Sequence, residues 1–217
     1  MGIGMAKSNR RGFIRSAFGA GVALSVAAAA PGWLGAQQAL AAEEHASISA
    51  DEALKRLMDG NARYVAAHAE HPEQSVERRL EVAKAQHPIA VVLGCADSRV
   101  APELLFDQGL GDVFTVRVAG NIADDAVIGS IEYALEHLHA PLVVVLGHER
   151  CGAVAAACDV VTKKATFPGS IGPMVKAIVP AAMAVKGQPG DLVDNTVRES
   201  AKRTAAQVAT SSKIVAD

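Results

Sequence analysis

Three side chains that can do chemistry follow a short apolar segment at residues 89–93. In the segment GCADSRV at residues 94–100, a thiol, a carboxyl and a guanidinium group are spaced two residues apart. Side chains two residues apart in an extended chain point to the same side, so Cys95, Asp97 and Arg99 can converge. We expect a metal-binding thiolate here, next to a carboxylate–guanidinium pair.

A second group follows another apolar segment, at residues 142–146. The segment GHERCG at residues 147–152 places His148 at the end of the expected strand and Cys151 in the first turn of the helix that should follow. The N-terminus of a helix favours a thiolate, because its dipole and its free amide groups stabilise negative charge. This segment therefore offers two further metal ligands.

Two cysteines and one histidine form a ligand set suited to catalytic Zn²⁺, which keeps a fourth position for water. A structural zinc site usually has a fourth Cys or His, and the remaining cysteine, Cys158, lies two helical turns beyond Cys151. Each residue alone has an ordinary explanation, such as packing for a cysteine or a structural ion pair for Asp97 and Arg99. Their occurrence at two strand ends of one small domain favours a metal site.

The elements that must position these residues follow from the hydrophobic pattern. Short, continuous apolar segments rich in β-branched residues, at 89–93, 113–118 and 142–146, are typical of buried parallel strands. Helices are expected at 49–67, with a capping box of Ser49 and Glu52, at 75–85, at 124–139 and along the alanine-rich stretch after Cys151. Strands that alternate with helices indicate an α/β fold with a parallel sheet, whose functional groups gather beyond the carboxyl ends of the strands.

Composition limits the class of protein. The chain has 217 residues, enough for one domain or for one domain with an appendage. Its formal net charge of −2 gives no reason to expect a nucleic-acid partner, and small or neutral substrates are expected instead. Three cysteines are too few, and odd in number, for a disulfide framework, so Cys158 is expected to be a small buried residue.

The first 41 residues are predicted to be a cleaved export signal. Two consecutive arginines in NRRGFIR at residues 9–15 precede an apolar segment at 17–30 and the small residues of ALA at 39–41. This order is typical of a bacterial twin-arginine signal. An uncleaved anchor is the alternative, but the apolar segment is shorter and richer in glycine and alanine than the about 20 apolar residues of a membrane span. We expect a periplasmic or otherwise exported domain over residues 42–217, without stable membrane insertion.

The two motifs together resemble the signature of the β-class carbonic anhydrases. CADSRV at residues 95–100 is followed about fifty residues later by GHxxCG at residues 147–152, and the resemblance extends from about residue 49 to the end of the chain. It includes PELLF at 102–106, RVAGN at 117–121, SIEYA at 130–134 and IGPM at 171–174. The paired motifs are highly specific, whereas the helical stretches give weak support.

The resemblance implies a function and a role for the matching residues. It implies zinc-dependent, reversible hydration of carbon dioxide to bicarbonate and a proton, by attack of a zinc-bound hydroxide, with one Zn²⁺ per chain. Cys95, His148 and Cys151 match the zinc ligands of the family. Asp97 and Arg99 match its dyad, in which the carboxylate accepts the hydroxide's proton in a hydrogen bond and the guanidinium keeps that carboxylate ionised.

The substrate pocket and the assembly are implied in the same way. Gln86, Phe114, Tyr133 and Gly152 match positions of the family's substrate pocket, which is commonly formed across a dimer interface. A homodimer or a higher even oligomer is therefore expected, in which the helix that begins after Ser49 embraces the partner subunit.

The chain departs from the family pattern at two places. Members in which the aspartate itself binds the metal have a tryptophan three residues before the first cysteine, where this chain has Val92, so the open form of the site is expected. The family also continues past the helix around residues 197–209 into another strand, of which Ile214 and Val215 are expected to be only the beginning. The expected fold is a parallel-core sheet flanked by helices, with its final edge strand missing.

Two other functions remain compatible with the sequence. A hydrolase of carbon disulfide or carbonyl sulfide would use the same zinc site on another linear triatomic molecule, with a different access tunnel. A non-catalytic zinc-binding protein is the second alternative, although metal storage has no use for the Asp97–Arg99 pair. A thiol redox protein is not favoured, because the sequence has no Cys-x-x-Cys pair.

Overall fold

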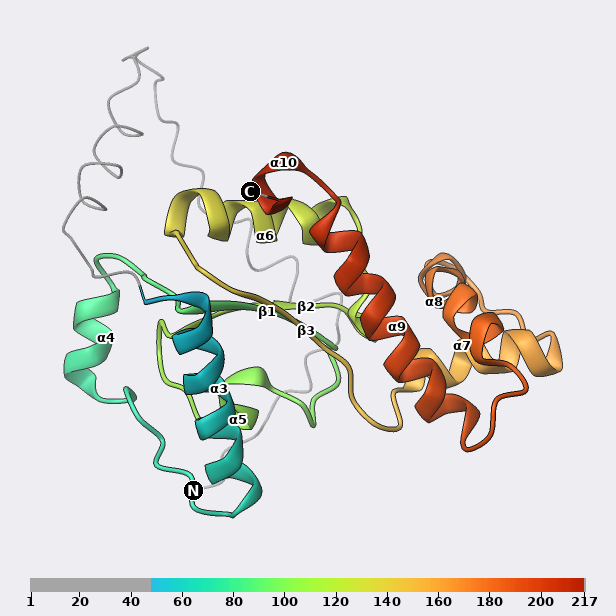
Figure 1. Ribbon diagram of the computed structural model, residues 1–217, viewed down its shortest axis with the longest axis horizontal. Helices are drawn as coiled ribbons and strands as arrows, with labels where there is room; N and C mark the ends of the chain where they lie inside the picture. Colours follow the sequence, from blue (N-terminus) through green and yellow to red (C-terminus); the bar gives the residue numbers. More distant parts are fainter. Residues whose placement is uncertain (1–47, 217) are drawn as a thin grey trace, which may run out of the picture. The chain divides into compact units, whose positions relative to one another are not determined.

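The computed structural model describes residues 48–216, so the predicted export signal at residues 1–41 lies outside the described part of the chain. Helices and strands alternate along most of it (Figure 1). In chain order the elements are α3 (Ala50–Val65), α4 (Val76–Val82), β1 (Ala90–Gly94), α5 (Pro102–Leu105), β2 (Val113–Arg117), the 3₁₀ turn η1 (Ala119–Asn121), α6 (Asp125–Leu138), β3 (Val143–Leu146), α7 (Gly152–Lys163), α8 (Ile171–Val185), α9 (Leu192–Ala209) and α10 (Lys213–Ala216). Over residues 48–216 no helix is both long and apolar enough to cross a membrane.

The three strands form one parallel sheet in the order β2-β1-β3, which confirms the predicted α/β class. Gly94, the last residue of β1, pairs with Arg117 of β2 on one side and with Leu146 of β3 on the other. The strands therefore end at the same edge of the sheet. The residues that follow β1 and β3, which include Cys95 and His148, leave this edge side by side.

Both faces of β1 are covered by helices, which explains its continuous apolar sequence. Val91 and Leu93 belong to a buried cluster with residues of α6, whereas Ala90 and Val92 belong to a cluster with residues of α3. Figure 1 shows α6 and α3 on opposite sides of the sheet. The alternation of side chains along a strand places successive residues in the two clusters, so neither face has room for a polar residue.

Helices α7, α8 and α9 pack against one another and enclose a third buried cluster. Cys158 is 4% exposed within it, and its sulfur lies 3.4 Å from Thr196 Oγ1. The prediction that Cys158 is a small buried residue is confirmed.

The interpretation of Ile214 and Val215 as the beginning of a strand was wrong, because both lie in the short helix α10. The amide of Ala216 donates to the carbonyl of Ser212, and Val215 packs against the cluster between the sheet and α6. Two adjacent apolar residues are compatible with a helix or a strand. In this chain the contacts of α10 with α6 and α9 favour the helix.

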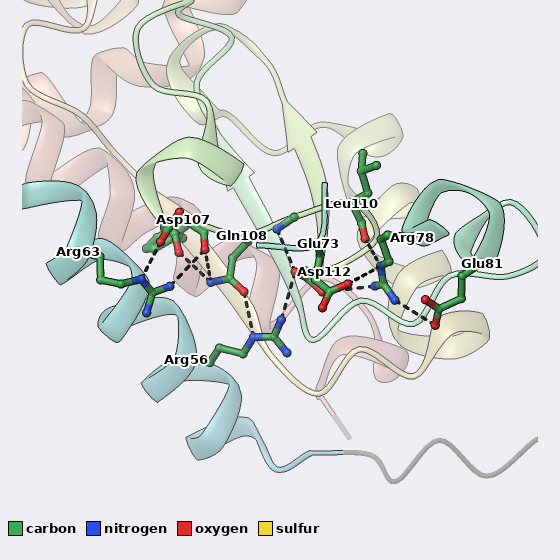
Figure 2. A network of polar contacts seen from close by, with 11 residues as sticks. Arg56, Arg63, Glu73, Arg78, Glu81, Asp107, Gln108, Leu110 and Asp112 are labelled. Atoms are coloured by element: carbon green, nitrogen blue, oxygen red, sulfur yellow. Dashed lines mark hydrogen bonds and ion pairs between the residues drawn. The ribbon is translucent and has the colours of Figure 1, made fainter. Parts of the chain in front are cut away.

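A polar network fixes the segment before β2 to α3 and to the region around α4 (Figure 2). Arg63 Nε donates to the buried Asp107 at 2.6 Å, and the amides of Glu70 and His71 donate to the same carboxylate at 3.0 and 2.9 Å. Asp112, also buried, contacts the guanidinium groups of Arg56 at 3.1 Å and Arg78 at 3.5 Å. Three arginines thus neutralise two buried carboxylates.

Acid is expected to weaken the fold through Asp107. Burial raises the pKa of Asp107, but the two amides and Arg63 outweigh it and hold the pKa at about 2. The unfolded carboxyl has a pKa near 4, so its contribution to stability is present above about pH 4 and is lost as the pH falls towards about pH 2. Asp107→Asn should lower the free energy of unfolding at pH 6 by about 3 kcal/mol. The substitution should also make the free energy of unfolding less dependent on pH between about pH 4 and 2.

Urea unfolding at several pH values tests this, with Asp59→Asn as the control because Asp59 is an exposed carboxylate paired with Lys55 on α3. An unchanged acid dependence in Asp107→Asn would exclude Asp107 as its source.

Candidate metal centre

Cys95, His148 and Cys151 meet beyond the edge of the sheet where β1 and β3 end. One donor atom from each lies within 4.8 Å of the other two, and the two sulfur atoms are 3.9 Å apart. Cys151 is the N-cap of α7, and Arg150 before it has a left-handed φ of 53°, which turns the chain between the two ligands of this segment. Both cysteines are buried.

The imidazole of His148 is oriented for metal binding. Its Nδ1 lies 3.0 Å from the carbonyl oxygen of Glu149, so a proton on Nδ1 donates to that carbonyl and leaves the lone pair on Nε2. Nε2 is buried and has no hydrogen-bond partner among the described residues. A buried acceptor without a donor is costly unless a cation or a water occupies it. Together with the two sulfur atoms, it fits a metal that prefers nitrogen and thiolate ligands.

The two thiols share their protons unequally. The pKa of Cys95 lies far below its ordinary value because the Cys151 thiol donates to its sulfur, and the amide of Gly120 donates to it as well at 3.3 Å, although burial acts in the opposite direction. The pKa of Cys151 is raised because the Cys95 sulfur and burial both retain its proton. A metal that replaces this shared proton would bind both sulfurs as thiolates.

Asp97 and Arg99 form a bidentate ion pair beside this group. Arg99 Nε donates to Asp97 Oδ1 at 2.9 Å and Arg99 Nη2 to Oδ2 at 2.7 Å. The guanidinium holds the pKa of Asp97 well below its usual range. Asp97 Oδ2 is 4.0 Å from His148 Nε2, so a permanently ionised carboxylate borders the place where the three ligands meet.

Arg117 positions the segment that carries Cys95 and Asp97, a role that the sequence did not show. Its Nε donates to the carbonyl of Cys95 at 2.9 Å and its Nη2 to the carbonyl of Asp97. The pairing of Arg117 with Gly94 places the guanidinium directly beside this turn. Arg117 is the first residue of the family segment RVAGN, which marks it as a candidate. Its contact with the carbonyl of Cys95 depends, however, on the register of β2 against β1.

Two of the four expected pocket residues contact each other in this single chain. Phe114 and Tyr133 contact each other, with ring centroids 6.3 Å apart, and Tyr133 is half exposed. Phe114 pairs with Val91, three residues before the end of β1. Gly152 begins α7 directly after a metal ligand. Gln86 is exposed before β1, and the described chain forms no hydrogen bond between it and the metal ligands. A pocket that unites all four remains a prediction.

The comparisons identify the family. A family model described as carbonic anhydrase matches residues 90–217, more than half of the chain. This chain belongs to the carbonic anhydrase family. A carbonic anhydrase of Mycolicibacterium smegmatis is 46% identical over 164 residues, which cover 76% of this chain and 80% of the relative. Carbonic anhydrase 2 of Mycobacterium tuberculosis is 50% identical over 131 residues, which cover 60% of this chain and 63% of the relative.

Solved structures place the fold in the β-class of this family. The Coccomyxa β-carbonic anhydrase in complex with acetazolamide is 28% identical with a TM-score of 0.58, over 75% of this chain and 74% of that one. The β-carbonic anhydrase CcaA has the same TM-score at 22% identity, over 75% and 76% of the two chains, and shows the fold alone. The family and the fold predicted from the two motifs are therefore confirmed, and the chain is an enzyme of this family.

Substitution of Gly120 by alanine is expected to weaken metal binding at the centre. Gly120 has a φ of 73°, and a Cβ atom there would lie 2.5 Å from Ile178 Cδ1 of α8 and 3.1 Å from Ala153 Cβ of α7. Because a residue with a Cβ is strained at this φ and Ala153 Cβ must also give way, we expect the turn to move and its amide to leave the sulfur of Cys95. Loss of such a supporting contact lowers metal affinity by about 10- to 100-fold. Competition with a chromophoric zinc chelator measures this.

Gly129→Ala is the matched control, because a Cβ at Gly129 in α6 meets nothing within 4 Å. It should leave metal affinity unchanged and add up to about 1 kcal/mol of helix stability. Equal affinities in the two variants would show that the Gly120 amide does not support Cys95.

Proposed function

We propose that this chain catalyses the reversible hydration of carbon dioxide to bicarbonate and a proton, with one Zn²⁺ held by Cys95, His148 and Cys151. The observation that carries the proposal is the buried Nε2 of His148, which has no hydrogen-bond partner within residues 48–216 and lies beside two sulfur atoms that are 3.9 Å apart. When bound, Zn²⁺ supplies a Lewis acid that makes hydroxide available from water at neutral pH.

The residues around the ligands have separate tasks in this reaction. Asp97 remains ionised and accepts a hydrogen bond from the nucleophile, which directs a lone pair of that nucleophile towards carbon dioxide. Arg99 keeps Asp97 ionised and occupies both of its oxygens, so that the carboxylate stays off the metal. Arg117 and the Gly120 amide hold the loop and the sulfur of Cys95 in place.

The two alternative functions are less well supported. The relatives over most of this chain are named carbonic anhydrases, which favours carbon dioxide over carbon disulfide or carbonyl sulfide. A non-catalytic zinc-binding protein would have no use for a bidentate Asp97–Arg99 pair at the metal.

We also propose that the active form is a homodimer or a higher even oligomer, with a substrate pocket formed by Gln86, Phe114, Tyr133 and Gly152. Support comes from α3, which exposes 45% of Leu54, 55% of Met58 and 75% of Val65. Exposed apolar side chains at helical spacing on one helix are typical of a surface that packs against a partner. A pocket across that interface would bring Gln86 and Gly152 together with the pair of Phe114 and Tyr133.

Export remains part of the proposal. The twin-arginine signal at residues 1–41 would carry the folded domain to the periplasm, so a metal could be inserted before transport. Removal of the signal would leave residues 42–217 as the active enzyme.

Carbon dioxide hydration by residues 42–217, followed by stopped flow with zinc measured on the same sample, tests the proposed activity. Rapid hydration with about one zinc per chain is expected. One zinc per chain without hydration would direct the same assay to carbonyl sulfide and carbon disulfide. Rapid hydration by metal-free protein would contradict the proposed mechanism.

A further inference from the structure

The two cysteines of the metal centre are close enough to react with each other. Their sulfur atoms are 3.9 Å apart, although Cys95 and Cys151 are 56 residues apart in the chain. A disulfide bond is about 2.0 Å long, so the sulfur atoms would have to approach each other by about 1.9 Å. Rotation about the two Cα–Cβ bonds, with a small shift of one segment, can supply an approach of this size.

The segment that carries Cys95 is held in place, whereas the segment that carries Cys151 lies at the surface. Arg117 donates to two carbonyl groups of the first segment. Arg150 and Gly152, on either side of the second cysteine, are exposed. A Cβ atom at Gly152 would meet nothing within 4 Å. We therefore expect the second segment to shift towards the first.

The burial of the sulfur atoms selects a small oxidant. Cys95 and Cys151 are 5% and 1% exposed, which hinders the approach of a protein oxidant or of glutathione disulfide. The side chains of Asp97 and Arg99, which border the group, are 20% and 60% exposed, so the centre opens to solvent on their side. Hydrogen peroxide is small enough to enter a centre that admits water and carbon dioxide.

We propose that, when zinc is absent, hydrogen peroxide oxidises this centre to a Cys95–Cys151 disulfide. The sulfur of Cys95 attacks one peroxide oxygen, so that a sulfur–oxygen bond forms, the oxygen–oxygen bond breaks and hydroxide leaves. The sulfur of Cys151 then attacks the sulfenic acid, so that the disulfide bond forms, the sulfur–oxygen bond breaks and a second hydroxide leaves. The two hydroxides take up the two thiol protons as water, and the peroxide gains the two electrons that the sulfur atoms lose.

The surroundings of the three cysteines assign their parts in this reaction. The amide of Gly120 donates to the sulfur of Cys95 at 3.3 Å and stabilises negative charge there, so Cys95 is attacked first. Cys158 takes no part, because it lies two turns along α7 from Cys151, about 10 Å along the helix axis and beyond the reach of a disulfide. Its sulfur contacts Thr196 Oγ1 instead, at 3.4 Å.

Zinc and this disulfide exclude each other, because both require the same two sulfur atoms. Oxidation would therefore close the centre to zinc, and bound zinc would protect the thiols. The inference rests on the ligand set of the proposed function but not on the reaction proposed for it.

Peroxide treatment of the zinc-loaded chain, with a chromophoric chelator that reports released zinc, tests the proposal. About one zinc should be released for about two thiols lost, and the mass of the chain should fall by about 2 Da. Peptide mapping should find Cys95 joined to Cys151 and Cys158 still a free thiol. A chain that binds no zinc would contradict the proposed function, whereas its thiol count and peptide map would still test the disulfide.

Cys158→Ser is the matched control, because serine keeps the shape of a side chain that is not a ligand, and this variant should form the same disulfide. Cys151→Ser should form no disulfide within the chain, and dimedone should trap its Cys95 as the sulfenic acid. Cys95→Ser provides the same test if Cys151→Ser does not fold. Zinc release without loss of thiols, a disulfide that includes Cys158, or a gain of about 32 Da at one cysteine without any linkage would overturn the proposal.

Discussion

His148→Ala is expected to lose bound zinc and carbon dioxide hydration together. His148 supplies the nitrogen donor of the group whose donor atoms lie within 4.8 Å of one another, and the alanine leaves two cysteines 3.9 Å apart without a third member of that group in the described part of the chain. Loss of a direct ligand should lower zinc affinity by more than the about 10- to 100-fold that follows loss of a supporting contact. Hydration should then fall to the rate of the solution without enzyme, because the metal supplies the nucleophile.

Zinc per chain after dialysis and stopped-flow hydration on the same sample measure both effects. Cys95→Ala and Cys151→Ala should behave in the same way. His139→Asn is the control, since His139 is exposed at the end of α6 and has a left-handed φ of 54°, which asparagine tolerates. A His148→Ala variant that keeps one zinc and its turnover would remove His148 from the ligand set.

The sequence was sufficient to predict the strands and the convergence of the two motifs, because both depend on local patterns. The apolar segment at 89–93 is continuous since α3 and α6 cover opposite faces of β1. Once β1 and β3 are parallel neighbours, their carboxyl ends must lie at the same edge of the sheet. Cys95 and His148 come just after these strand ends in the chain, so they must lie close together. No distant contact was needed for this inference.

The contacts that support the site were not predictable, because they depend on register and on distant packing. Arg117 reaches the carbonyl of Cys95 only in the register that pairs it with Gly94, and a shift by one residue would turn it to the other face of the sheet. Gly120 is favoured as a glycine by its φ of 73°, and Ile178 of α8 and Ala153 of α7 lie against it, but nothing near Gly120 in the sequence indicates those helices.

The assignment of Ile214 and Val215 to a strand was wrong for a related reason. Val215 packs against the cluster that includes residues of α6, whereas Ile214 is exposed, and the contacts of α10 with α6 and α9 decided the structure of this two-residue apolar segment. Asp107 and Asp112 likewise resemble ordinary surface acids in the sequence, and only the fold brings Arg56, Arg63 and Arg78 to them.

Asp97→Asn is expected to keep zinc and to lose most of the turnover. The three ligands are untouched, and asparagine has nearly the same shape at a position whose side chain is 20% exposed. The amide is neutral, however, and only one of its two terminal atoms accepts hydrogen bonds, so it cannot both pair with Arg99 and orient the nucleophile. Loss of an orienting group of this kind lowers kcat by about 10²- to 10³-fold. Steady-state kinetics and zinc content of the same sample measure it, and full activity would exclude the proposed role.

The partner of Asp97 allows a sharper test. If Arg99 acts only by holding Asp97 ionised and in place, its removal should matter only while Asp97 is present. Arg99→Gln alone should therefore lower kcat, whereas the double variant Asp97→Asn with Arg99→Gln should be no slower than Asp97→Asn. Losses that multiply in the double variant would show that Arg99 contacts the substrate or product independently. Non-additive losses would make Arg99 a positioning residue that acts through the carboxylate.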